Sequence, residues 1–393
     1  MSIVGVDYTE ITGLTATGAT DGSGAWNTGI DLASFGVAAG ATGAIILIEN
    51  TSSSNRWVGL RDNGKANAHI HQDALGRYSY PSFVSLTGGL VDLYFEAGVR
   101  FFVLAYTDSD FIPFDVDGAL PTQAHVAGVE QLTVANASVP LSATLIIGKG
   151  QNTWAPAEAG GALSRPYNSA GIHLTPLNEA NEFYSTDSIS GTILGYDTSP
   201  VTALPGTAVS VTSDGLWADA NVSFPGASFV FGWGETSASD TKIELRAKGS
   251  AWTPNNDGGR IKSSTTSPFM STPVNAAGEF ETYVEAGDAS PQILLFGYTG
   301  DPVPTPTVTL SADLQPGASF TLTYSDYDSA PVSPVTITDS NGNSITVAVT
   351  ISDTVDGSSK HGGTATGTMP ALPSSGTATG LLFGTVTIEL GTV

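Results

Sequence analysis

TSSSNRWVGLRDNG, residues Thr51–Gly64, returns without a gap as TSASDTKIELRAKG, residues Thr236–Gly249. Thr, two Ser, Leu, Arg and Gly recur in step. A second echo follows in the same order, with YFEAG at Tyr94–Gly98 and YVEAG at Tyr283–Gly287. The distance between the copies changes only slowly along the chain, as insertions in loops would make it. The sequence therefore contains a duplicated module.

The residues around these echoes are typical of an all-β fold. Only 13% of the residues are charged, and the abundance of Gly, Ser, Thr and Ala favours short strands joined by tight turns. Both faces of Val99–Thr107 are largely apolar, so this strand is expected in the centre of a sandwich. Ala97-Gly98 and Ala286-Gly287 predict hairpin turns. We expect tandem β-sandwich modules of a jelly-roll-like kind.

These patterns divide the chain into four domains. Module A spans residues 1–115, and its repeat, module B, spans 205–302. Residues 116–204 are assigned to a diverged β module, because two apolar runs there resemble strands of A and B although the Tyr-x-Glu-Ala-Gly motif is missing. After a proline-rich linker, residues 303–393 are expected to form an immunoglobulin-like β-sandwich, with a hairpin at Asn341-Gly342.

Charge and composition exclude several classes of protein. The formal net charge is −24 with only 13 Lys and Arg, which argues against a nucleic-acid partner because phosphate binding needs clustered cations. The chain has no Cys, its start MSIVGVDYTE lacks the features of a signal peptide, and no run approaches the length of a membrane span. We therefore expect synthesis in a cytosol without a signal peptide, and no membrane insertion.

Each candidate chemical site has a simpler structural interpretation. His69-Ile70-His71 places two imidazoles on one face of a strand, where a metal ion could bind them. A solvated strand or loop is favoured, so His69 and His71 are weak metal candidates and no cofactor is expected. The acids of Asp108–Asp110 and Asp115–Asp117 resemble calcium loops, but turn chemistry explains them equally. His361 lacks a visible partner for a catalytic triad.

The duplicated polar residues also favour structural roles. Glu96 and Glu285 precede the same tight turn in both copies, which argues against general acid or base catalysis. Arg61 and Arg246 are expected to pair with an acid inside each module. Tryptophan rings can stack on sugars, but core packing is favoured for each Trp. The six are Trp26, Trp57, Trp154, Trp217, Trp233 and Trp252. No catalytic residue is predicted.

YFEAGVRFFVLAYTD and its partner YVEAGDASPQILLFGYTGD resemble β modules of structural proteins in tailed bacteriophages. The C-terminal part resembles the immunoglobulin-like domains appended to phage capsid, decoration and tail proteins. The resemblance implies a non-enzymatic virion protein, first of all a capsid decoration or head-fibre protein, made in the host cytoplasm. Its implied partners are other virion proteins, further copies of the chain, as in a trimer, and a host surface glycan. A tail-fibre or baseplate adhesin and a carbohydrate-binding protein are the alternatives.

The same interpretation predicts how the chain would attach to a particle. One module is expected to bind the shell or tail through an edge strand or an apolar patch, while the others project. The two apolar faces of Val99–Thr107 place this contact in the duplicated region. Residues 303–393 are expected to be removable without unfolding the rest.

Overall fold

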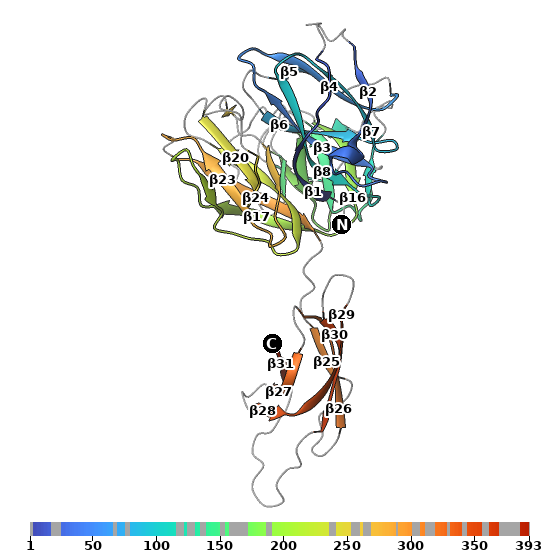
Figure 1. Cartoon of the computed structure of the whole chain (residues 1–393), viewed down its shortest axis with the longest axis vertical. Coiled ribbons are helices and arrows are strands. Elements are labelled where there is room, and N and C mark those ends of the chain that lie inside the picture. The colour runs from blue at the N-terminus through green and yellow to red at the C-terminus, as the bar shows by residue number, and fades with distance from the viewer. Residues whose placement is uncertain are drawn as a thin grey trace, which may run out of the picture. The chain divides into compact units, whose positions relative to one another are not determined.

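The computed structural model is all-β and confirms the predicted fold class (Figure 1). The chain forms two compact units, Met1–Asp301 and Pro302–Val393. Within the described residues the one helical element is a 3-10 turn, η1 (Leu32–Phe35). The structure describes residues 3–16, 25–65, 69–74, 79–114, 122–123, 130–133, 139–149, 154–156, 172–185, 191–235, 241–252, 260–261, 269–287, 290–300, 307–310, 319–327, 331–339, 344–355, 361–368 and 386–392.

Unit 1 contains three modules; the first corresponds to module A, the middle one to the diverged module and the third to module B. The first module is a sandwich of two antiparallel four-stranded sheets, with the orders β1-β8-β3-β6 and β2-β7-β4-β5. Consecutive strands alternate between the two sheets except at β4 and β5, as in a double-sheet jelly roll. The strands are β1 (Ile3–Glu10), β2 (Asn27–Asp31), β3 (Gly43–Asn50), β4 (Arg56–Asp62), β5 (His69–Ala74), β6 (Ser79–Ser85), β7 (Leu90–Phe95) and β8 (Val99–Thr107).

The third module repeats this topology strand for strand, with the orders β17-β24-β19-β22 and β18-β23-β20-β21. Arg61 lies opposite Asp92 in the first module, and Arg246 lies opposite Glu281 in the third. The duplication in the sequence is therefore a duplication of strand pairing. The strands are β17 (Val201–Val209), β18 (Trp217–Asp219), β19 (Ala227–Glu235), β20 (Thr241–Ala247), β21 (Arg260–Ile261), β22 (Phe269–Pro273), β23 (Phe280–Val284) and β24 (Gln292–Gly300).

The strands between these modules follow the same order. One sheet has the order β10-β16-β12-β14, with β9 also paired to β16, and the other has the order β11-β15-β13. Together β9 and β10 occupy the place of β1. The strands are β9 (Phe111–Pro113), β10 (Thr122–Gln123), β11 (Glu130–Thr133), β12 (Leu145–Lys149), β13 (Trp154–Pro156), β14 (Ile172–Pro176), β15 (Glu182–Ser185) and β16 (Gly191–Asp197).

All three modules carry an irregularity at the same step of the same strand pair. The register shifts after Ile45 in β3, after Ile147 in β12 and after Phe231 in β19. At this step in the third module only Gly fits, because a Cβ on Gly232 would lie 2.1 Å from the carbonyl oxygen of Leu294. Bulges are retained features of a fold rather than defects, so their common position supports descent of the modules from one unit.

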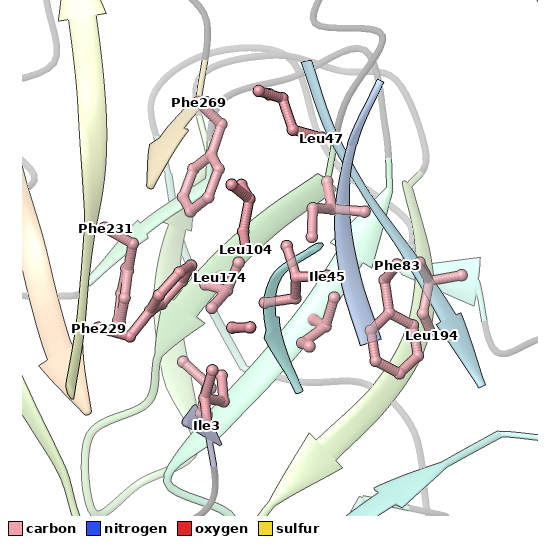
Figure 2. Close-up of a cluster of buried hydrophobic side chains, with 14 of the residues drawn as sticks. Ile3, Ile45, Leu47, Phe83, Leu104, Leu174, Leu194, Phe229, Phe231 and Phe269 are labelled. Atoms are coloured by element: carbon pink, nitrogen blue, oxygen red, sulfur yellow. The ribbon is translucent and has the colours of Figure 1, made fainter. Parts of the chain in front are cut away.

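Each module has its own apolar core, and a further cluster joins all three. In β3, Ala44, Ile46 and Ile48 face the core of the first module, whereas Ile45 and Leu47 face the shared core. The labelled side chains in Figure 2 come from all three modules. They are Ile3, Ile45, Leu47, Phe83 and Leu104 of the first, Leu174 and Leu194 of the middle one, and Phe229, Phe231 and Phe269 of the third.

The shared core corrects the expected arrangement of modules. In Val99–Thr107, Phe101 and Val103 lie in the core of the first module, and Phe102 and Leu104 lie in the shared core. Both apolar faces of the strand are therefore covered inside unit 1. The first three modules do not project separately, and this strand offers no free surface for attachment.

The expected hairpins at Ala97-Gly98 and Ala286-Gly287 are wrong in their pairing. Both are tight turns, with φ of 91° at Gly98 and 100° at Gly287. However, β7 pairs with β2 and β4, while β8 pairs with β1 and β3. The turn therefore passes the chain from one sheet to the other. A local turn signal specifies the reversal of the chain but not which strands become neighbours.

Unit 2 contains two antiparallel sheets, with the orders β25-β26-β30-β29 and β28-β27-β31. Thr338 of β27 lies opposite Ser344 of β28, as the Asn-Gly signal predicts. The first sheet has the order of strands A, B, E and D in immunoglobulin sandwiches, and the immunoglobulin-like assignment stays a prediction. The proline-rich linker lies outside the described residues. The strands are β25 (Thr307–Leu310), β26 (Ser319–Tyr327), β27 (Pro331–Asp339), β28 (Ser344–Val347), β29 (Val349–Val355), β30 (His361–Thr368) and β31 (Val386–Thr392).

Candidate functional site

The duplicated arginines form equivalent ion pairs across two strands. Arg61 Nε lies 2.9 Å from Asp92 Oδ2, and Arg246 Nε lies 2.6 Å from Glu281 Oε2. The sequence-based prediction that each arginine pairs with an acid of its own module is confirmed. Each pair ties the fourth strand of its module to the seventh, so the duplication preserves a structural contact.

A tryptophan lies under each of these arginines. The guanidinium carbon of Arg61 is 4.2 Å from the centroid of the Trp26 ring, and that of Arg246 is 4.2 Å from the Trp217 ring. Tyr94 and Tyr283 contact the same two rings in tilted geometry. One face of each indole is thus occupied by a cation, and that face is not open for stacking on a sugar ring.

The remaining tryptophans contribute little open ring surface within the described residues. Trp233 and Trp252 are buried, and Trp252 stacks on Tyr8 with ring centroids 4.2 Å apart. Trp57 is half-buried. The side chain of Trp154 lies outside the described part of the chain. Core packing, the favoured interpretation, holds for Trp233 and Trp252.

The two ion pairs give a matched test of burial. Arg61→Met is expected to lower the free energy of unfolding of unit 1 by about 3–5 kcal/mol, because it leaves a buried carboxylate unpaired. Arg246→Met should cost less, because the Glu281 side chain is 16% exposed and that of Asp92 only 1%. Urea unfolding followed by tryptophan fluorescence measures both variants. Equal losses of unfolding free energy would show that burial of the carboxylate does not determine how much the ion pair stabilises the unit.

Glu96 and Glu285 also have matching contacts. Glu96 Oε2 accepts the backbone N–H of Trp57 at 3.4 Å, and Glu285 Oε2 accepts that of Lys242 at 3.2 Å. Trp57 and Lys242 are the second residues of equivalent strands, next to the tight turn. These glutamates therefore secure the ends of strands, in agreement with the structural role that their duplication favoured.

The metal candidates lie mostly outside the described part of the chain. His69 and His71 lie in β5, opposite Leu60 and Val58 of β4, and their side chains lie outside the description. Asp108 Oδ1 accepts the backbone N–H of Asp110, which is ordinary turn chemistry, while Asp115–Asp117 are not described. Among the described residues, no three His, Cys, Asp or Glu side chains gather where they could hold a metal ion.

His361 has a partner that the sequence did not reveal. Its Nδ1 lies 2.5 Å from Asp353 Oδ2, and the Tyr324 hydroxyl donates to Asp353 Oδ1 at 2.9 Å. The contact with His361 holds the pKa of Asp353 below its usual range. A triad would also need a nucleophile against the second ring nitrogen. Among the described residues His361 contacts Asp353, and Asp353 contacts Tyr324, so this network ties β26, β29 and β30 together.

A buried polar cluster lies where the first and third modules meet. On β20, Ile243 and Leu245 face the core of the third module, so Glu244 between them points to the opposite side. There Ser79 Oγ of β6 donates to Glu244 Oε1 at 3.0 Å. Burial raises the pKa of Glu244 to about 8; Ser79 and Lys242 oppose this shift and Glu49 adds to it. Sequence analysis missed this residue because the equivalent position of the first module is Gly59.

Tyr8 joins the same two modules. It has φ of 34° within the bulge of β1, and its hydroxyl donates to the carbonyl oxygen of Leu245 at 2.5 Å. Its ring stacks on Trp252, which in turn contacts Phe102 edge to face. Burial raises the pKa of Tyr8, so its hydroxyl stays protonated and acts as a donor.

Unit 2 has an open cleft of about 510 Å³. Its lining is uncharged and dominated by hydroxyl groups. The lining residues are Ser319, Thr346, Val347, Ala348, Thr350, Thr366, Gly367 and Thr368. Ligand sites usually combine apolar walls with a few convergent polar groups, and this cleft lacks aromatic walls. Its chemistry alone therefore points to no ligand.

Comparison with known proteins gives no relative: no family model, curated protein or solved structure matches the chain. Over the residues that the structure describes, no helix is long and apolar enough to cross a membrane.

Proposed function

We propose that this chain is a non-enzymatic structural protein of a phage virion, in first place a capsid decoration or head-fibre protein. The observation that carries the proposal is the packing of three modules with one strand order around a shared core, in a chain that also carries a separate β unit. Double-sheet jelly rolls recur in viral capsid and lectin domains. Because one fold serves many functions, the assignment also depends on the polar residues.

The polar residues favour a structural role over catalysis. The duplication singles out the polar residues Arg61, Arg246, Glu96 and Glu285, and the ion pairs and hydrogen bonds described above join each of them to a residue of its own module. A catalytic site would need a nucleophile or an acid-base pair with convergent geometry. The duplicated residues instead perform the same structural task twice, which supports selection for a rigid building unit.

The described tryptophans favour a virion component over a carbohydrate-binding protein. Trp26 and Trp217 lie under arginines, and Trp233 and Trp252 are buried. Sugar recognition through aromatic platforms would need exposed rings. A tail-fibre or baseplate adhesin would share all the structural features, so it differs from the decoration protein only in location. Association of several copies stays part of the proposal.

The test is to find the chain in particles. Phage particles from a culture that produces the chain are purified on a density gradient, and heads are then separated from tails. We expect quantitative peptide mass spectrometry to find the chain in the head fraction at a fixed ratio to the major capsid protein. Presence in the tail fraction alone would favour the adhesin. Absence from both fractions would contradict a virion role.

A further inference from the structure

The contact between the first and third modules contains two carboxyl groups buried near one another. Glu244 of β20 is 8% exposed and Glu49 of β3 is 1% exposed, and they interact electrostatically. Arg100 NH2 lies 2.5 Å from Glu49 Oε2, so Glu49 has a cation of its own. Glu244 accepts a hydrogen bond from Ser79 and senses the ammonium of Lys242.

Two tyrosines and an arginine also lie around Glu244. A negative charge on Glu244 contributes to raising the pKa of Tyr8 of β1 and of Tyr283 of β23. Arg246 on the same face of β20 is engaged by Glu281 and by the carbonyl oxygen of Trp252. A charged Glu244 would thus be a second buried carboxylate beside Glu49, with Lys242 as the nearby cation that offsets it. A neutral Glu244 avoids this cost.

We propose that the contact between the first and third modules is a proton-dependent seam, which is held most firmly when the Glu244 carboxyl carries its proton. Separating the modules brings Glu244 into water, where the carboxyl ionises readily. The proton therefore binds more tightly to the closed seam than to the open one. Acidification favours the closed seam, and loss of the proton favours local opening of β20, β6 and β1.

The direction of the pH dependence and the pH range over which it acts follow from the pKa of Glu244 in the closed and open seam. The pKa of Glu244 is about 8 in the folded chain against 4.5 for the free group. The stabilisation is complete below pH 4.5 and is lost as the pH rises towards 8. In this window the equilibrium constant for opening should grow up to about tenfold per pH unit, and above pH 8 the effect of this group should level off.

Hydrogen exchange of the whole chain at pH 5 to 9, corrected for the intrinsic exchange rate, tests the seam. Protection of β20 relative to β12 is expected to fall as pH rises to 8 and then to level off. Glu244→Gln imitates the protonated carboxyl, so its protection should be independent of pH. At pH 7 this variant should open less often than the wild type by on the order of a hundredfold. Glu279→Gln, in the same module but at a partly exposed position away from Glu244, should keep the pH dependence.

Three outcomes would overturn the proposal. They are a wild-type protection that does not change between pH 5 and 8, a Glu244→Gln variant that retains the change, and an equal loss of protection in all strands. Should Glu244→Gln fail to fold, Glu49→Gln provides a second test. Removing the neighbouring carboxylate lowers the cost of ionising Glu244. The fall in protection with rising pH must then level off at a lower pH than in the wild type. An unchanged end point contradicts the seam.

Discussion

Phe231→Ala is expected to destabilise all three modules of unit 1 together, by about 3–5 kcal/mol. Phe231 lies on β19, is fully buried and belongs to the shared core. Its ring stacks on Phe269 with centroids 6.3 Å apart. Truncation leaves a cavity that the surrounding sheets of three modules cannot easily fill. Because a typical domain is stable by only about 5–15 kcal/mol, the loss is a large part of the total.

Urea unfolding combined with hydrogen exchange measures this effect. Peptides from β3, β12 and β19 should lose protection in a single transition at a lower urea concentration than in the wild type, while β26 in unit 2 is unchanged. Phe320→Ala removes a buried ring from unit 2. It should lower the urea concentration at which β26 loses protection and leave β3, β12 and β19 unchanged. Loss of protection in β19 with β3 and β12 unaffected would show that the modules fold independently of the shared core.

The repeat made the fold largely predictable from the sequence. The echo of Thr51–Gly64 in Thr236–Gly249 identified two modules, and apolar runs such as Val99–Thr107 coincide with observed strands. The ends of strands and the tight turns were also readable, because Gly supplies the positive φ that these turns need. Local chemistry was enough for these features.

The middle module was harder to see because its clearest echo is with the third module alone. PLNEANEF at Pro176–Phe183 matches PVNAAGEF at Pro273–Phe280. In both turns the first Asn side chain accepts two backbone N–H groups, and its amide donates to the closing Glu. The first module has Leu86-Thr87-Gly88-Gly89 at this place. The Tyr-x-Glu-Ala-Gly motif, which marks the first and third modules, does not include this signal.

The shared core and the seam could not be read from periodicity. Apolar residues on both faces of a strand show that both faces are covered, but they do not identify what covers them. For Val99–Thr107 one cover is the module's own second sheet and the other is the neighbouring modules. Glu244 likewise differs from Gly59 at the equivalent position, and only the fold shows that Ser79 and Glu49 lie beside it.

A fragment that ends after β8, residues 1–107, is expected to aggregate, although it contains every strand of a complete jelly roll. Alone it would expose the side chains that the first module gives to the shared core, among them Ile45, Leu47, Phe83, Phe102 and Leu104. Each fully buried large apolar side chain contributes about 1.5–3 kcal/mol. Their sum is on the order of 10 kcal/mol, which is as large as the whole stability of a typical domain.

The separate units of the chain provide the control. A chain ending at Asp301 should keep the transition of unit 1, and a fragment of residues 302–393 should stay folded, because Met1–Asp301 and Pro302–Val393 each form a compact unit. Light scattering and circular dichroism compare the three fragments. Refolding 1–107 together with 108–301 should recover a soluble complex, since the second fragment supplies the missing cover. A soluble monomer of 1–107 that unfolds cooperatively would contradict this prediction. It would show that the first module's own core stabilises it by more than exposure of its apolar outer face destabilises it, so that the shared core joins modules that are already stable alone.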